Sequence, residues 1–170
     1  MNRVFKIKKA FIVPFVIAVA LLFALLALSF FIGQPWEKMV LGVLCFLTTV
    51  VAVEASEREF AVSQDTLRIK KFFRVKNFNW AEITHLGVVV MRNKAYFLLT
   101  TTKGFYMFSN LWQDHTLLIQ YLSEKLGDEK VEAEFKNYLG NPIERTSLIV
   151  LTWVAVIIIV AIILTKLFVS

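Results

Sequence analysis

Few of the side chains that usually perform catalysis or bind metals occur in this sequence of 170 residues. It has two histidines, His85 and His115, and one cysteine, Cys45. Asp114 precedes His115 and could orient its imidazole, but a carboxylate there is also typical of a solvated first helical turn, where it favours the positive end of the helix dipole. Cys45 lies within an apolar run, where cysteine behaves as a small apolar residue.

The sequence motifs of common catalytic sites are missing as well. There is no glycine-rich phosphate loop ending in Gly-Lys-Ser/Thr, no Gly-x-Ser-x-Gly elbow and no His-Glu-x-x-His pair. A single cysteine excludes both a disulfide within the chain and a metal site of several cysteines. We therefore expect no catalytic residue, no metal and no cofactor, and a protein that is not an enzyme.

Hydrophobic residues make up 58% of the chain, and they are concentrated in three runs without a charge, over residues 10–36, 39–53 and 146–165. The segment 54–145 contains 41 apolar residues in 92, or 45%. That share is ordinary for a water-soluble domain, in which about 45–50% of residues are apolar. The distribution predicts three hydrophobic helices and one globular module.

A helix needs about 20 apolar residues to cross the hydrocarbon core of a bilayer. The first run exceeds the roughly 7–15 apolar residues of a signal peptide, so a retained span is favoured over a cleaved one. The second run is short, and we expect it to cross the bilayer only if the helix continues to Ser56. A re-entrant or surface helix is the alternative. We expect a transmembrane hairpin over 10–56 and a third span over 146–167.

Basic residues in short flanking segments predict the orientation, because they stay on the cytoplasmic side. The loop between the first two runs has only Lys38, and the C-terminal flank only Lys166. We expect a plasma (inner) membrane protein with a cytoplasmic tail over 1–9, a cytoplasmic module and an outside C-terminus. The tail contains four basic residues, Arg3, Lys6, Lys8 and Lys9.

Period-two patterning predicts short strands in the first part of the module, for example over 66–69, where apolar and basic side chains alternate. Apolar spacings of three and four from Leu111 then predict a helix, with Asn110 as its N-cap and Gly127 at its C-terminal end. A second helical pattern over 128–139 predicts a linker helix within 128–145 that leads to the third span.

Four features of the sequence form a pattern: two N-terminal apolar runs, the strand pair from Phe60 to Ile69, the Asn79-Trp80-Ala81-Glu82-Ile83 element and the hairpin from Leu98 to Phe108 around Lys103-Gly104. In this pattern the chain resembles bacterial pleckstrin-homology-like (PH-like) domain membrane proteins. The resemblance covers about residues 10–126 and implies a PH-like β-barrel or sandwich over 57–127 that ends in a helix. The third span, and a first basic hairpin turn without glycine, depart from that pattern, and a YcxB-like membrane protein is the alternative.

The expected first hairpin of the module concentrates positive charge. In lipid-binding PH domains this hairpin holds phosphorylated headgroups, so the resemblance implies contact with anionic lipid; nonspecific attraction to an anionic leaflet is the alternative. Phe72 and Phe73, at its turn, fit either the core or a lipid or partner contact. The basic residues of the hairpin are Arg68, Lys70, Lys71, Arg74 and Lys76.

These features predict an integral membrane protein that displays a binding or scaffold domain. Its expected partners are membrane lipids, and a membrane-protein partner or a second copy is the other possibility. Nucleic acid is not expected, because no base-stacking motif is evident. The alternative function is an accessory subunit of a larger membrane transport or assembly complex.

Overall fold

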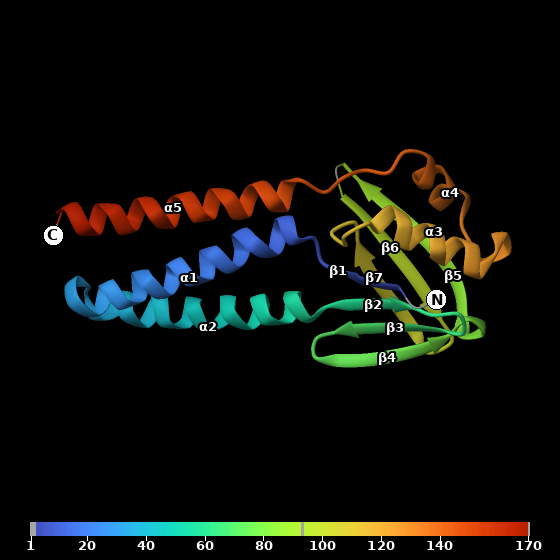
Figure 1. Cartoon of the computed structure of the whole chain (residues 1–170), viewed down its shortest axis with the longest axis horizontal. Helices are drawn as coiled ribbons and strands as arrows, with labels where there is room; N and C mark the ends of the chain where they lie inside the picture. The colour runs from blue at the N-terminus through green and yellow to red at the C-terminus, as the bar shows by residue number, and fades with distance from the viewer. Residues whose placement is uncertain (1–2, 93, 170) are drawn as a thin grey trace. The chain divides into compact units, whose positions relative to one another are not determined.

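The computed structural model describes residues 3–92 and 94–169. The chain divides into two compact units, which are described separately. One, the strand module, comprises Met1–Lys8 and Glu57–Thr146; the other, the helical unit, comprises Lys9–Ser56 and Ser147–Ser170. Figure 1 shows the strands and short helices of the first unit and the long helices of the second.

The helical unit has three long helices among its described residues: α1 (Lys9–Ile32), α2 (Pro35–Glu57) and α5 (Ser147–Val169). All three are long and apolar enough to cross a membrane, which confirms the expectation of three candidate spans. The second is a continuous helix of 23 residues, although its uncharged run is only 15 residues long. At 1.5 Å per residue, a helix of this length reaches across a hydrocarbon core of about 30 Å.

Apolar contacts hold the helical unit together. Leu22 and Leu25 of α1 pack with Val156 and Ile159 of α5, and Cys45 of α2 belongs to the same buried cluster. Hydroxyl groups bond back to the helix backbone, as at Ser29, whose Oγ donates to the Leu25 carbonyl at 2.9 Å. Bonding of this kind satisfies a polar side chain inside an apolar helix.

Two antiparallel sheets form the strand module, with the strand orders β1-β2-β3-β4 and β5-β6-β7 (Figure 1). The first sheet consists of β1 (Arg3–Lys6), β2 (Glu59–Val62), β3 (Thr66–Lys71) and β4 (Arg74–Asn79). The second consists of β5 (Ile83–Met91), β6 (Lys94–Thr101) and β7 (Gly104–Ser109). The short 3₁₀ turn η1 (Trp80–Glu82) joins the two sheets.

The N-terminal tail contains a strand that the sequence analysis did not predict. β1 pairs with β2, with Lys6 opposite Glu59, although the two long helices α1 and α2 lie between these strands in the sequence. Ile7 then forms a bridge to Trp112, and the Lys8 amide donates to the Leu111 carbonyl at 3.0 Å. The tail therefore forms an edge of the folded module.

The helix after β7 begins later than expected. α3 spans His115–Leu126, so Asn110 is not its N-cap, whereas Gly127 is its C-cap as predicted. The reason is that the residues after β7 pair with the N-terminal tail, where the Gln113 amide donates to the Lys6 carbonyl at 2.8 Å. Backbone groups used in that pairing are not available to a helix.

The segment after α3 packs on the module and is not one linker helix. It forms a 3₁₀ turn, η2 (Asp128–Lys130), and a short helix, α4 (Ala133–Gly140). Val131 interrupts the helical pattern because it bridges Leu86 of β5, and the Glu132 amide donates to the Leu86 carbonyl at 3.1 Å. This stretch covers the outer edge of β5.

Candidate binding groove

The register of the β3–β4 hairpin divides the five predicted basic residues between two faces. Leu67 pairs with Phe78, and both are buried on the inner face. Since side chains alternate along a strand, the pairs Ile69–Lys76 and Lys71–Arg74 lie on the same face. Arg68 and Lys70 therefore lie on the opposite, outer face, where Lys70 pairs with Glu57 at 2.9 Å.

Two exposed phenylalanines form the tip of this hairpin. Phe72 and Phe73 have positive φ angles of 52° and 57°, and their relative exposures are 62% and 59%. A two-residue hairpin turn of this kind favours Asn-Gly, because a left-handed conformation costs a residue with a β-carbon about 1–2 kcal/mol. Lys71 Nζ lies 5.3 Å from the centre of the Phe72 ring, within the range of a cation–π contact. The tip is therefore apolar, exposed, strained and flanked by positive charge.

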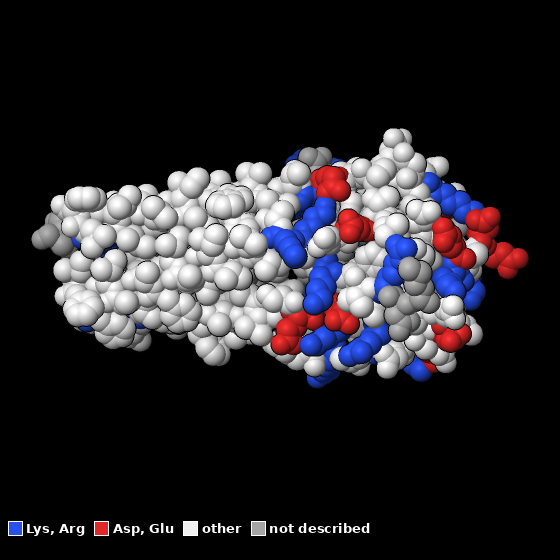
Figure 2. All heavy atoms as spheres, in the orientation of Figure 1, with Lys and Arg blue, Asp and Glu red and all other residues white. Residues whose placement is uncertain are grey.

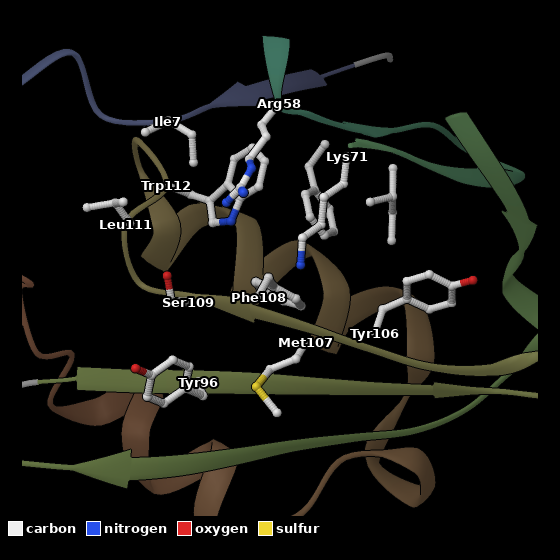
Figure 3. A pocket seen from close by; sticks show the side chains of 12 residues that line it. Ile7, Arg58, Lys71, Tyr96, Tyr106, Met107, Phe108, Ser109, Leu111 and Trp112 are labelled. Carbon is white, nitrogen blue, oxygen red and sulfur yellow. The ribbon is translucent and has the colours of Figure 1, made fainter. Parts of the chain in front are cut away.

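Behind this tip, two adjoining hollows form a groove between the inner face of the first sheet and β7. One has a volume of about 620 Å³ and the other about 220 Å³. Figure 3 shows the smaller one, into which Arg58 and Lys71 extend, opposite Tyr106 and Phe108 of β7, while Met107 points to the other side of the strand. We call the two hollows together the inter-sheet groove; they share Ile69, Lys71, Tyr106 and Met107 as lining residues.

Both hollows of the groove have cationic lining residues, and the smaller one is lined mainly by apolar side chains. Lys76 donates to the Tyr106 hydroxyl at 2.6 Å, and Tyr106 packs on Phe78 with ring centroids 4.9 Å apart. No Asp or Glu is among the described residues that line either hollow. The four cationic lining residues are Arg58, Lys71, Arg74 and Lys76.

Chain connectivity fixes which end of the first sheet bears the hairpin tip. The chain leaves β1 at Lys6 and enters α1 at Lys9, and it leaves α2 at Glu57 and enters β2 at Glu59. Glu59 is paired with Lys6 on one side and with Lys70 on the other. The Phe72-Phe73 tip is therefore at the end of the sheet from which both helical connections depart.

A second group of polar side chains lies buried on the other side of the module. Asn110 Nδ2 donates to the Ile143 carbonyl at 2.6 Å, and the Tyr138 hydroxyl also donates to it at 3.1 Å. His115 Nε2 lies 3.3 Å from the same hydroxyl. Burial lowers the pKa of the His115 imidazole and outweighs the effect of the nearby Glu144 carboxylate, which acts in the opposite direction.

Both histidines make contacts within the fold. His115 is only 2% exposed, so its imidazole offers no access to a substrate. His85 Nε2 lies 2.6 Å from Glu132 Oε1, near the outer edge of β5. In the part of the chain that the structure describes, no three His, Cys, Asp or Glu side chains gather in a way that could hold a metal ion.

Charged side chains are concentrated over the strand module, and the surface of the helical unit is nearly free of them in the view of Figure 2. Comparison with known proteins gives no further assignment: no family model, no curated protein and no solved structure matches this chain. The candidate site therefore rests on the geometry of the module alone.

Proposed function

We propose that this chain is an integral membrane protein whose PH-like module acts as a cytoplasmic binding domain at the plasma (inner) membrane. In this proposal the β3–β4 tip contacts the anionic surface of the bilayer, and the module serves as a scaffold without catalysis. The observation that carries the proposal is the exposed Phe72-Phe73 turn with Lys71 and Arg74 on either side.

The conformation of the turn supports a role outside the module. Two bulky residues with positive φ destabilise an isolated hairpin, and strain of this kind concentrates at functional sites. Neither ring gains core packing in exchange, because both are largely exposed. Aromatic rings at the depth of the lipid headgroups are stabilised by the mixed polar and apolar surroundings there.

Charge and connectivity support the same contact. Each Lys or Arg close to an anionic membrane surface contributes about 1 kcal/mol of attraction. Lys71, Arg74 and Lys76 are close to the sheet end from which the chain continues into α1. Connections of only two residues before α1 and one after α2 restrict how far this end can be from a bilayer that contains the helices.

The arrangement of elements supports the PH-like assignment. A sheet of four antiparallel strands, a sheet of three and then a helix, α3, follow one another, as the resemblance implies. In this chain the first strand, β1, precedes the helical hairpin, so the hairpin interrupts the connection between β1 and β2.

Fluorescence quenching tests the proposed contact in the full-length protein. A Cys45→Ala, Phe73→Cys variant carrying an environment-sensitive dye is reconstituted into nanodiscs that contain a headgroup spin-labelled lipid. The matched control places the dye at Gln64, an exposed residue in the β2–β3 turn at the opposite end of the same sheet.

We expect strong quenching of the dye at position 73 and little at position 64, because only the tip reaches the headgroups. Replacing phosphatidylglycerol with phosphatidylcholine should reduce the quenching at 73, since the attraction depends on anionic lipid. Equal quenching at the two positions, or none at 73, would falsify the proposed contact.

A further inference from the structure

We infer that the inter-sheet groove binds one anionic lipid molecule, with its headgroup at Arg74 and Lys76 and its acyl chain between the two sheets. The inference rests on the proposed function in one respect, because the groove opens beside the tip that would meet the bilayer. It adds a defined ligand: a single amphiphile withdrawn into the module, as distinct from the lipid surface.

The inner face of the β3–β4 hairpin changes from charged to apolar in regular steps. Lys71 and Arg74 form the row nearest the tip, and Ile69 and Lys76 form the next. The third row, Leu67 with Phe78, is fully buried in the core. Rows on one face of a strand are about 7 Å apart. Leu67 and Phe78 line neither hollow, so an acyl chain with its headgroup at the first two rows would continue past Ile69 toward Phe60, its neighbour on β2.

The inner end of the groove favours an acyl chain over a polar ligand. Phe60, Phe108 and Trp112 line it, and their rings pack on one another, with centroids 4.9 Å apart for Phe60–Phe108 and 4.8 Å for Phe60–Trp112. Arg58 and Lys71 also extend into this hollow, so a polar ligand could bond to them, but the faces of the three rings offer it no hydrogen bond in place of those to water. An acyl chain gains free energy by leaving water.

The outer end of the groove favours an anion. Arg74, Lys76 and Lys71 line the larger hollow, and no described lining residue is acidic. Charge-assisted hydrogen bonds from such side chains to phosphate oxygens are stronger than those between neutral groups. A zwitterionic or cationic headgroup would add a positive charge beside them.

The groove is open along one side, so a lipid can enter it. β7 is the last strand of its sheet, and no further strand pairs with its outer edge among the described residues. Phe105 and Met107 of this strand border the larger hollow and are mostly exposed. They alternate with Tyr106 and Phe108, which face the first sheet, so they form the rim of the opening.

Native mass spectrometry of the full-length protein in a neutral sugar detergent tests the inference. Three probes separate the contributions: lysophosphatidic acid has an anionic head and a chain, lysophosphatidylcholine has the chain with a zwitterionic head, and glycerol phosphate has the head alone. We expect one retained lysophosphatidic acid, clearly weaker retention of lysophosphatidylcholine and none of glycerol phosphate. Each methylene should contribute about fourfold to affinity.

Two matched variants locate the site. Met107→Glu places a negative charge at the rim of the groove, and Met91→Glu places the same charge at an exposed methionine that borders only a separate hollow on the outer face of the same sheet, which Met107 also borders. We expect Met107→Glu to reduce retention of lysophosphatidic acid more than tenfold and Met91→Glu to leave it unchanged. Equal effects, or retention that Met107→Glu does not change, would overturn the inference, because the lipid would then be bound elsewhere.

Arg74→Gln with Lys76→Gln provides a second test should Met107→Glu fail to fold. Losing both charges should weaken retention of lysophosphatidic acid about fivefold per charge and leave lysophosphatidylcholine unchanged. Equal losses for both lipids would contradict the assigned headgroup position.

The quenching experiment at residue 73 distinguishes failure of this inference from failure of the proposed function. Quenching without retention of a single lipid overturns the groove alone. Saturable binding of glycerol phosphate without its chain would also overturn it, since that result indicates an anion site with no acyl chain.

Discussion

The two sheets of the strand module enclose a filled half and an open half. In the filled half, Phe97 is fully buried and contacts Phe108, Phe135 and Tyr138, with ring centroids 5.0, 5.8 and 5.3 Å apart. In the open half, beside the β3–β4 hairpin, the corresponding space is the inter-sheet groove, which is lined by cations.

The difference follows from which elements close each half. α4 contributes Phe135 and Tyr138 to the filled half, and the segment before it covers the edge of β5. No described element covers the outer edge of β7 in the same way. The comparison indicates that packing in one half stabilises the module and leaves the other half available for binding.

The largest expected effect is the loss of a ring from the filled half. Phe97→Ala should lower the free energy of unfolding of the module by about 3–5 kcal/mol, because it leaves a cavity among three aromatic rings. Phe105→Ala in the open half should change it by less than about 0.5 kcal/mol, since this ring is exposed. Urea unfolding of the full-length protein in detergent, followed by tryptophan fluorescence, measures both. Similar losses for the two variants would remove the distinction between the halves.

The buried amide of the filled half should give the next largest effect. Asn110→Ala leaves the Ile143 carbonyl and the Ala95 amide without one partner each. We expect a loss of about 1–3 kcal/mol in the same unfolding assay. Asn77→Ala, at an exposed position of β4, is the control and should have almost no effect. A loss at Asn77 as large as that at Asn110 would contradict this assignment.

A change at the tip of the open half should act in the opposite direction. Replacing Phe72 and Phe73 with Asn and Gly removes the strain of two positive φ angles and should stabilise the module by about 1 kcal/mol. The same change removes both exposed rings from the proposed lipid contact. If the module were destabilised instead, packing of the two rings would contribute more to its stability than the strain of the positive φ angles costs.

The smallest expected effect concerns pH. The unfolded chain has the ordinary histidine pKa of 6.5, and burial lowers the pKa of His115 in the folded module. The unfolded state therefore takes up the proton first, so stability falls as the pH falls below about 6.5. Melting temperatures measured between about pH 7.5 and 5.5 should decline less in His115→Gln than in the unchanged protein. Parallel declines in the two proteins would assign the effect to other groups.

The sequence predicts the elements whose signal is local. The three apolar runs match α1, α2 and α5, and the alternation over 66–69 matches β3. The face of Lys71 also follows from that alternation, because it is two residues beyond Ile69. Once the turn is placed at Phe72-Phe73, the alternation assigns each basic residue of the hairpin to one of its two faces.

Features that depend on distant partners could not be predicted. β1 is a short basic segment whose partner, β2, follows only after two long helices, and its charges have an alternative explanation as a cytoplasmic tail. Because this tail pairs with residues 111–113, α3 begins later than the apolar pattern predicts. No local sequence pattern indicates that pairing either. The groove also requires β7 to face the first sheet, as in the Lys76–Tyr106 and Phe60–Phe108 contacts, and nothing in the sequence specifies those contacts.

A comparison of the two faces of the basic hairpin tests the proposed membrane contact directly. The dye at residue 73 reports contact with anionic nanodiscs in proteins that also carry Arg74→Gln with Lys76→Gln, or Arg68→Gln with Lys70→Gln. We expect the inner pair to reduce quenching and the outer pair to leave it nearly unchanged. Equal losses from both pairs would contradict a contact through the inner face, because a general attraction between the module and the membrane would then explain the quenching.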